Sequence, residues 1–482
     1  MMGIKQGQKE LFSYQVDLDK RVREEHPLRK VHEQVDFEFV RREVADLYGY
    51  NGNVSVDPAV IAKMMFLLFY DDVASERELM RIIPERLDYM WFLGYGLDDE
   101  IPDHSVLSKA RKRWGVEVFE SLFVQLVSQC VAAGLVDGKK IHVDASLVAA
   151  NASKDSVVKG TPEWIGALKR AYQATESKLE DTTTPGTRVA VNDTALSTTD
   201  PDAGLTRVGG GQSRPRYHHH RVVDDKRGVI TAIETTSGTI AENKKLVALL
   251  QQHTQNTGRD AETVVADSKY GTAENYVECQ KRAVRTHMGD VQGAVKAANP
   301  RCRGIYPEES FKYEPATNTY QCPAGKTMTA RRLHPRRRTW EYHTARGVCG
   351  ACALRAKCTR AAFGRTVRRH ENQELLDRAR EQAHSPAAYR DRRRRKHLAE
   401  GSFADAANNH HFKRSRWRRL WRQQIQDYLI ATIQNVKILL KQVARRPAMA
   451  MGQVRSECRK VFAQIAGCFV GKSGPLPQLA LI

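Results

Sequence analysis

The sequence lacks a long hydrophobic run. Its longest apolar stretch, Ile61 to Tyr70, contains Lys63 and is far shorter than the roughly 20 residues that a membrane-spanning helix needs. No secretory signal-peptide pattern follows Met1. These absences argue against a membrane or secreted protein, and we expect a cytoplasmic one.

Cysteine is also scarce, with nine residues in a chain of 482. So few cysteines are not typical of the disulfide framework of small secreted proteins, and we expect them to be reduced thiols or ligands of a metal site. The length predicts several domains with an ample core. Hydrophobic residues make up 41% and charged residues 28% of the chain, a composition that excludes a wholly disordered protein.

Acidic residues are too few to balance the basic ones. The chain has 77 Lys and Arg against 56 Asp and Glu, a net charge of +21. A scattered excess would indicate only a solvated surface, but this one gathers in clusters at 331–338, 390–396 and 413–422. Clustered cations favour nucleic acid as a partner because each one placed on a phosphate releases a condensed counterion. Trp417 and Trp421 lie in the third cluster at helical spacing, where we favour core packing over base stacking.

The hydrophobic pattern changes from helical to strand-like along the chain. Apolar residues at helical spacing predict an all-helical region over 57–134, which begins with Asp57 as an N-cap and Pro58 at the first helical position. Alternating residues then predict a strand that ends at Asp144. Further elements are predicted as a loop at 181–216, strands at 217–223 and 229–235 joined by a hairpin turn, a helix near 242–253, a strand at 263–267, an insertion at about 300–369, and helices at 372–398 and 425–440.

Carboxylates follow two of these predicted strands. Asp144 and Asp267 each come directly before small residues. An isolated aspartate at such a place is most often a cap or turn residue. Two of them from different strands can instead converge on divalent metal through oxygen ligands, as two-metal phosphoryl transfer requires. Glu400, between two arginine-rich clusters, is the candidate for a third ligand, and a surface ion pair is its alternative interpretation.

Around these carboxylates the sequence resembles the DDE-class insertion-sequence transposases over nearly its whole length. Each similar segment is weakly specific alone, but the ordered set is specific. The segments are Asp57-Pro58, Ser75-Glu-Arg-Glu-Leu79, Trp91-Phe-Leu-Gly94, Pro102-Asp-His-Ser105, Val143-Asp-Ala-Ser146, Ala150-Asn-Ala-Ser153, Thr199-Asp-Pro-Asp-Ala203, Tyr217 to Asp224, Val265-Ala-Asp-Ser-Lys-Tyr-Gly271 and Glu400-Gly-Ser-Phe-Ala-Asp405.

The resemblance implies a catalytic triad of Asp144, Asp267 and Glu400 that binds two Mg²⁺ or Mn²⁺ ions. It also implies an α/β fold class: an RNase H-like mixed sheet flanked by helices, with an all-helical N-terminal domain and a small Cys-rich metal-binding insertion. The expected domains are a helical DNA-end-binding domain at 1–137, a catalytic core at 138–299 and 371–445, the Cys-rich insertion at 300–370, and a C-terminal tail at 446–482.

The sequence departs from the family pattern around the glutamate. Members often carry Tyr and Arg seven and four residues before it and Lys seven residues after it, where this chain has Arg393, Lys396 and Ala407. Lys396 keeps the positive charge, whereas Arg393 and Ala407 do not fit. Lys413 or Arg414 is the candidate for the missing contact, and an excision route through a hairpin stays open.

Four cysteines have the spacing of metal ligands. Cys322, Cys349, Cys352 and Cys358 form the pattern C-x26-C-x2-C-x5-C. A Cys-x2-Cys pair can present two thiolates to one ion, and two more complete a tetrahedral site. We expect structural Zn²⁺, with a 4Fe-4S cluster and unmetallated thiols as the alternatives.

Other candidate ligands are weaker. His334 or His343 could replace a cysteine, and Cys302 is a spare. The remaining cysteines are expected to pack as small apolar residues; they are Cys130, Cys279, Cys458 and Cys468. The run from His218 to His220 is expected at the surface or facing DNA, and we predict no metal there.

The sequence therefore predicts a transposase that binds the terminal inverted repeats of its element and cuts and joins DNA. It would act as a homodimer or higher synaptic complex on the nucleoid in the cytoplasm. Two alternatives stay open: a catalytically inactive, transposase-derived DNA-binding regulator, and a metal-dependent nuclease. The expected DNA-binding residues are Arg393, Lys396, Lys413, Arg414, Arg416, Trp417 and Arg418.

Overall fold

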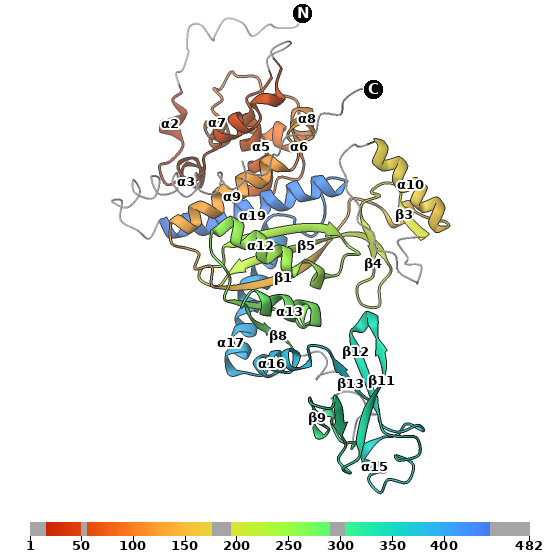
Figure 1. Ribbon diagram of the computed structural model, residues 1–482. Helices are drawn as coiled ribbons and strands as arrows, with labels where there is room; N and C mark the ends of the chain where they lie inside the picture. Colours follow the sequence, from red (N-terminus) through yellow and green to blue (C-terminus); the bar gives the residue numbers. More distant parts are fainter. Residues whose placement is uncertain (1–15, 50–54, 176–193, 290–303, 444–482) are drawn as a thin grey trace, which may run out of the picture. The chain divides into compact units, whose positions relative to one another are not determined.

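The computed structural model describes residues 16–49, 55–175, 194–289 and 304–443 (Figure 1). The chain divides into two compact units. The first comprises Met1–Ala261 and Arg395–Ile482, and the second comprises Glu262–Arg394. The predicted C-terminal tail, Cys302, Cys458 and Cys468 lie outside the described residues.

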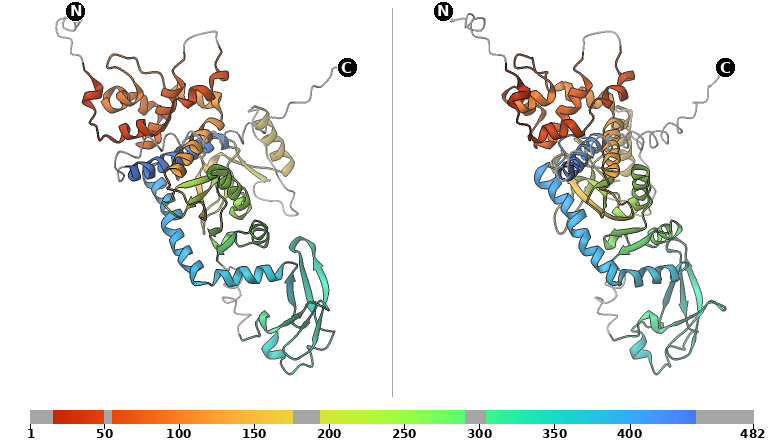
Figure 2. Two further views of the ribbon diagram at one scale, coloured as in Figure 1. Left: turned by 60° about the vertical axis from the view of Figure 1, so that its left-hand side comes forward. Right: turned by 90° about the vertical axis from the view of Figure 1, so that its left-hand side faces the viewer.

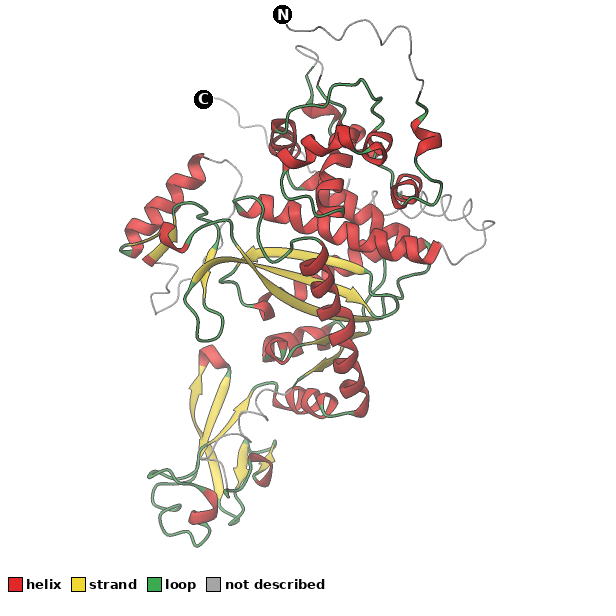
Figure 3. Cartoon of the chain, turned by 180° about the vertical axis from the view of Figure 1, so that it is seen from behind, coloured by secondary structure: helices red, strands yellow, loops and turns green. Residues whose placement is uncertain are grey.

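In the described residues before β1 the first unit contains helices and no strand, as predicted (Figure 3). The Asp57 side chain accepts a hydrogen bond from the Ala59 amide and Pro58 follows it, so the predicted helix start is confirmed. Within the described residues no single helix is long and apolar enough to span a membrane, and only the pair Ser105–Trp114 and Glu117–Ala132, bent by 83°, passes that test together. The helices are α2 (Leu18–Arg21), α3 (Pro27–Gln34), α4 (Phe39–Glu43), α5 (Pro58–Tyr70), α6 (Glu76–Ile82), α7 (Leu87–Leu93), α8 (Ser105–Trp114) and α9 (Glu117–Ala132).

An antiparallel sheet follows these helices. β5 (Arg214–Asp224) pairs with β1 (Lys140–Ala149), with β6 (Ile230–Ser237) and with β4 (Gly204–Thr206). The predicted hairpin between β5 and β6 is confirmed. The predicted end of the first strand at Asp144 is wrong, because residues 145–149 continue in register against 216–220 of β5. Asp144 therefore lies in the middle of a strand.

The predicted loop at 181–216 is also partly wrong. Residues 176–193 lie outside the described part, but β3 (Ala195–Ser197), β4 and the start of β5 fall inside that range. These strands are too short to give a periodic signal, and each forms by pairing with a neighbour: β3 pairs with β2 (Val157–Lys159), and β4 with β5. The helix α10 (Pro162–Thr175) follows β2.

One hydrophobic core joins the N-terminal helices to the sheet and to the C-terminal helices of the first unit. The long helix α19 (Leu420–Val443) packs against α5, α9 and β6, and it confirms the helix predicted at 425–440. α12 (Leu246–Thr257), preceded by a 3₁₀ turn at Glu242–Lys245, also packs on β6 and confirms the helix predicted near 242–253. α18 (Gly401–Asn409) contributes Phe403 and Ala406 to this core.

The second unit contains a parallel strand pair, β7 (Thr263–Ala266) and β8 (Arg285–Met288), with α13 (Ala273–Lys281) between them in the chain. The predicted strand at 263–267 is confirmed. The single helix predicted at 372–398 is wrong. α16 (Gln373–Ala383) ends before Pro386, which begins α17 (Pro386–Arg395), and the two helices meet at an angle (Figure 2).

The rest of the second unit is a five-stranded antiparallel sheet with a small core of its own. Its order is β13-β12-β11-β10-β9, and the buried residues include Tyr320, Met328 and Tyr342. The elements are β9 (Lys312–Glu314), β10 (Thr319–Gln321), β11 (Thr327–His334), β12 (Thr339–His343), α15 (Arg355–Cys358) and β13 (Val367–His370). This sheet occupies the predicted insertion.

A buried carboxylate anchors the start of α19. Asp200 is 0% exposed, and its Oδ1 accepts hydrogen bonds from the Tyr217 hydroxyl at 2.6 Å and the Arg419 amide at 3.0 Å. Asp202 accepts from Arg419 Nε at 2.9 Å and from the Leu420 amide at 3.0 Å. Burial raises the pKa of Asp200 to about 6. The segment between β3 and β4 therefore caps α19 with two carboxylates.

The raised pKa of Asp200 predicts that the stability of the folded protein depends on pH. The folded pKa of Asp200 lies above its ordinary value of 3.8, so the unfolded chain loses this proton first as the pH rises. The free energy of unfolding should therefore fall by up to about 3 kcal/mol as the pH rises from about 4 to about 6. Asp200→Asn removes this dependence and should raise the melting temperature more at about pH 7.5 than at about pH 5 in scanning calorimetry.

Asp202→Asn is the matched control for this experiment. It weakens the ion pair with Arg419 and should lower the melting temperature at both pH values. An Asp200→Asn effect of the same size at both pH values would contradict the prediction.

Candidate active site

Asp144 lies in the middle of β1 and is nearly enclosed. Its side chain is 13% exposed, and its Oδ1 accepts a hydrogen bond from the Ala145 amide at 2.9 Å. Burial raises the pKa of Asp144, while the Arg395 guanidinium opposes the rise. The carboxylate of Glu400 adds to the rise, which shows that these two acidic groups lie within electrostatic reach of each other.

Glu400 is the last residue of a short π-helix. This five-residue segment, Lys396–Glu400, lies between α17 and α18 in the chain. π-helical turns are rare and are found frequently at functional sites. The Glu400 side chain is 49% exposed, so one side of this carboxylate is open to solvent.

Arg395 joins these two carboxylates. Its Nη1 lies 2.9 Å from Asp144 Oδ2, and its Nη2 lies 3.0 Å from Glu400 Oε1. The Arg395 side chain is 12% exposed. The structure therefore brings Asp144 and Glu400 to opposite sides of one guanidinium, that of Arg395. The alternative interpretation of Glu400 as part of a surface ion pair describes only half of this arrangement, because the second partner of Arg395 is the enclosed Asp144.

Arg221 provides a second cation beside Asp144. It stands opposite Asp144 in the pairing of β1 with β5, and it is completely buried. Its Nη1 donates to Ser402 Oγ at 3.0 Å and to Gln434 Oε1 at 3.1 Å. Burial lowers the pKa of Arg221 to about 10, and nearby carboxylates, Asp144 among them, oppose this. Arg221 thus ties β5 to the helix that follows Glu400.

Lys413 provides a third cation. Its Nζ donates to Ser146 Oγ at 2.7 Å, two residues along β1 from Asp144. Burial lowers the pKa of Lys413, and the charge of Asp144 opposes this. A parallel bridge between Ala149 and Arg414 holds this segment beside the end of β1.

Asp267 directly follows β7 in the second unit, as predicted. It caps a 3₁₀ turn at Ser268–Tyr270, and its Oδ1 accepts hydrogen bonds from the Ser268 amide at 2.6 Å and the Ser268 hydroxyl at 3.2 Å. The interpretation of Asp267 as a cap residue is therefore confirmed. The convergence of Asp267 with the other two carboxylates stays a prediction.

The chemistry of these side chains suits a divalent cation. All three are carboxylates, the hard oxygen ligands that Mg²⁺ and Mn²⁺ prefer. A positive group, the Arg395 guanidinium, already lies between two of them. Within the described ranges, however, no group of three or more His, Cys, Asp or Glu side chains is arranged so that it could hold a metal ion.

The predicted DNA-binding residues separate into two groups. Arg393, Lys396, Lys413, Arg414 and Arg418 are exposed. Exposed cations near a carboxylate site are available for phosphate contacts. These five stay candidates for binding DNA.

Arg416 and Trp417 belong to the second group, whose side chains are used inside the protein. Arg416 pairs with Asp72 at 2.7 Å and donates to the Val73 carbonyl. Trp417 Nε1 donates to Glu76 at 3.0 Å, and the Arg111 guanidinium lies 3.9 Å from its ring centroid. These contacts attach the segment before α19 to the N-terminal helices, as core packing would. Trp417 precedes α19, so the helical spacing with Trp421 does not reflect a shared helix.

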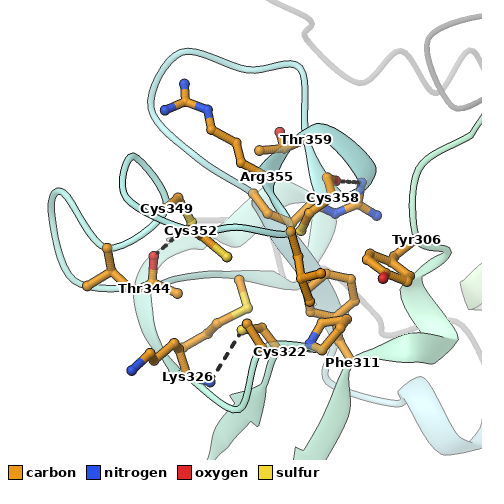
Figure 4. Close-up of a pocket in the computed structure, with 16 residues that line it drawn as sticks. Tyr306, Phe311, Cys322, Lys326, Thr344, Cys349, Cys352, Arg355, Cys358 and Thr359 are labelled. Carbon is orange, nitrogen blue, oxygen red and sulfur yellow. Dashed lines mark hydrogen bonds between the residues drawn. The ribbon is translucent and has the colours of Figure 1, made fainter.

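The four spaced cysteines line one pocket of the second unit (Figure 4). The Lys326 amide donates to Cys322 Sγ at 3.4 Å, and the Thr344 hydroxyl lies 3.2 Å from Cys349 Sγ. Burial raises the pKa of the Cys358 thiol; Arg365 opposes the rise, and the other three cysteines add to it. Chain positions as far apart as 322 and 358 thus line one pocket, and the metal site that their spacing predicts stays a prediction.

Other candidate ligands are engaged elsewhere. His334 and His343 both face Glu341, at 3.1 Å and 4.0 Å, and neither lines the cysteine pocket. Cys130 and Cys279 are buried, as expected for cysteines that pack as apolar residues.

The three consecutive histidines are buried, so the expected surface or DNA-facing position is wrong. His218 is 7% exposed, and His219 and His220 are 0% exposed. They lie on β5, whose faces are covered by the helices of the first unit. His218 and His220 share one face, with ring centroids 4.6 Å apart, and His219 pairs with Asp427 at 2.9 Å.

Sequence reasoning missed Arg395 and Arg221. Arg395 is one of several arginines in a row, and only the π-helix distinguishes it from its neighbours. Arg221 follows the three histidines in a polar part of its strand. The feature that could have identified it is its position opposite Asp144 in the pairing of β1 with β5.

Comparisons with known proteins point to one family. Residues 16–113 match a transposase domain (DUF772), and residues 321–440 match a transposase DDE domain. Among curated proteins no sequence matches the chain.

Similar solved structures are those of transposases. A cryo-EM structure of the piggyBac transposase synaptic complex with hairpin DNA has 8% identity and a TM-score of 0.36, and the match covers 94% of this chain and 82% of that one. The Mos1 transposase paired-end complex with the left transposon end, and the Mos1 mariner paired-end complex with Mn, each have 12% identity and a TM-score of 0.16, over 56% of this chain and 70% of theirs.

The identification rests on the two domain matches. One covers the first helices of the first unit, from α2 into α8. The other covers the four spaced cysteines, the strands β11, β12 and β13, and Glu400 with the residues around it. A transposase DDE domain is the catalytic domain of enzymes that carry out DNA transposition. The resemblance found in the sequence motifs is thus confirmed: the chain carries two transposase domains, one of them a DDE domain.

Proposed function

We propose that the protein is an active transposase that binds the terminal inverted repeats of an insertion sequence, cleaves the DNA there and joins the freed ends to a target. The observation that carries this proposal is the meeting of Asp144 and Glu400 on one guanidinium. The transposase domain matches support the reaction class, and the contacts of Arg395 with both carboxylates support this part of the chain as its site.

In this proposal Asp144, Asp267 and Glu400 hold two Mg²⁺ or Mn²⁺ ions. When bound, such ions activate water or a DNA 3′-hydroxyl for in-line attack on a phosphodiester and stabilise the leaving oxygen. The carboxylates position this chemistry and take no covalent part in it. No nucleophilic side chain is therefore required.

The exposed cations would hold the DNA. Each can neutralise one phosphate; they are Arg393, Lys396, Lys413, Arg414 and Arg418. Lys413 would do so beside Ser146, which lies on the same strand as Asp144. The N-terminal helices would recognise the element ends. Because two ends must be paired, the working form would be a homodimer or a larger synaptic complex on the nucleoid.

Two other functions share this site. An inactive descendant would bind DNA and regulate, and the departures at Arg393 and Ala407 favour that alternative. A nuclease would cut without joining. The ion pairs of Arg395 with both carboxylates favour an intact catalytic centre over a decayed one.

Strand transfer tests the proposal. We expect the full-length protein to join inverted-repeat DNA from its own element to a target plasmid in Mg²⁺ or Mn²⁺. Asp144→Asn and Glu400→Gln should each reduce the joined product at least about a thousandfold, because each removes a charged metal ligand. Glu381→Gln changes an exposed carboxylate on α16 and should leave the product unchanged.

The products separate the three functions. Joined product made by the wild type alone supports the transposase. Cleavage without joining would show a nuclease, and tight DNA binding with no cleavage by any variant would show an inactive regulator. Circular dichroism of each variant confirms that it is folded.

We also propose that the cysteine pocket holds a structural Zn²⁺ ion through Cys322, Cys349, Cys352 and Cys358. Support comes from their spacing and from their place around one pocket, beside a hydrophobic core that has five buried residues in the described part of the chain. Metal binding can supply the folding energy that so small a core lacks. A 4Fe-4S cluster would use the same thiols.

Metal analysis of the purified protein tests this site. We expect about one zinc per chain, lost in Cys352→Ser and kept in Cys130→Ala, whose cysteine lies in α9 of the first unit and does not line the pocket. Chelation should lower the melting temperature of the wild type. Iron with visible absorbance would show the cluster instead, and a metal-free protein with an unchanged melting temperature would contradict both.

A further inference from the structure

The ion pairs of Arg395 occupy the carboxylate oxygens that a metal ion would need. Asp144 Oδ2 and Glu400 Oε1 each lie within 3.0 Å of the guanidinium. Both carboxylates belong to the proposed metal centre. A divalent cation that binds them through these oxygens must displace Arg395 or share them with it.

The backbone selects Arg395 for this place. Arg395 ends α17 and Glu400 ends the π-helix, five residues later. On an α-helix the residue four positions before Glu400 would share its face, and that residue is Lys396. In a π-helix the hydrogen bonds join residues i and i+5, so the residue that shares the face of Glu400 is the one five positions before it, Arg395. Lys396 is exposed, and Arg395 faces both carboxylates.

Charge explains why a guanidinium stands there. Two carboxylates at one point repel each other, and Asp144 is nearly enclosed. Arg395 contributes one positive charge and a planar fork that can reach both. Arg221 and Lys413 also face Asp144, from β5 and from the segment before α19. Asp144 therefore keeps compensating charge when Arg395 leaves.

We propose that Arg395 is a positioning residue that closes the metal site in the DNA-free protein and releases it when DNA binds. The same planar fork that bridges the carboxylates can bind a phosphate in bidentate fashion. A DNA phosphate would draw Arg395 away and leave the two carboxylates to the divalent ion. Metal loading would thus be coupled to the presence of DNA. This inference rests on the proposed function.

Direct Mn²⁺ binding to the full-length, DNA-free protein tests the inference, read from the EPR signal of free Mn²⁺. Arg395→Met should bind Mn²⁺ about tenfold more tightly than the wild type, which corresponds to about 1.4 kcal/mol. Arg395→Lys keeps the charge but loses the fork, so it should fall between the two. Arg378→Met is the matched control: Arg378 is an exposed arginine on α16 outside the proposed DNA-binding residues, and its loss should change the affinity by no more than about twofold because an exposed charge is screened by salt.

A second arm adds a short nonspecific DNA duplex. DNA should raise the Mn²⁺ affinity of the wild type more than that of Arg395→Met, since the variant has no bridge to release. Comparison of the variants in the same DNA removes the contribution of Mn²⁺ bound to the duplex itself.

The outcomes separate this inference from the proposed function. If Asp144→Asn abolishes Mn²⁺ binding but Arg395→Met binds no more tightly than the wild type, the inference is overturned and the metal centre stands. If neither wild type nor Arg395→Met binds Mn²⁺ in an Asp144-dependent way, the metal centre itself is overturned. Equal tightening in Arg378→Met and Arg395→Met would also overturn the inference, because it would show a general charge effect without competition for the carboxylates.

Discussion

A carboxylate enclosed on a central strand needs positive charge around it, and this constraint organises the first unit. Burial raises the pKa of Asp144, which means that its ionised form is costly without partners. Arg395, Arg221 and Lys413 approach it from a helix end, from the neighbouring strand and from the segment before α19. Satisfying Asp144 also fixes the helix that carries Glu400, so the electrostatic requirement of one residue assembles the proposed catalytic pair.

The same use of arginine extends beyond the site. Arg416 and Arg111 hold the N-terminal helices to the segment before α19 through Asp72, Glu76 and the ring of Trp417. Part of the large positive charge of this chain is therefore structural, and only the exposed part is available for the proposed contacts with DNA. Net charge alone therefore overstates the number of basic residues that are available to a nucleic-acid partner.

The sequence predicted what depends on local pattern. The hairpin of β5 and β6, the strand before Asp267 and the helix α19 follow from periodicity and turn residues. It could not predict what depends on tertiary pairing. β3 and β4 are too short for a pattern, and β1 continues past Asp144 because β5 pairs with it. The π-helix has no compositional signal, so spacing pointed to Lys396 where the structure uses Arg395.

An anomalous difference map from crystals of the protein with Mn²⁺ and its DNA end would test the central claim most directly. The account predicts Mn²⁺ peaks within coordination distance of Asp144, Asp267 and Glu400, with the Arg395 guanidinium turned from the carboxylates to a phosphate. A map with no Mn²⁺ at these carboxylates, and with Arg395 still bridging Asp144 and Glu400 beside bound DNA, would contradict it.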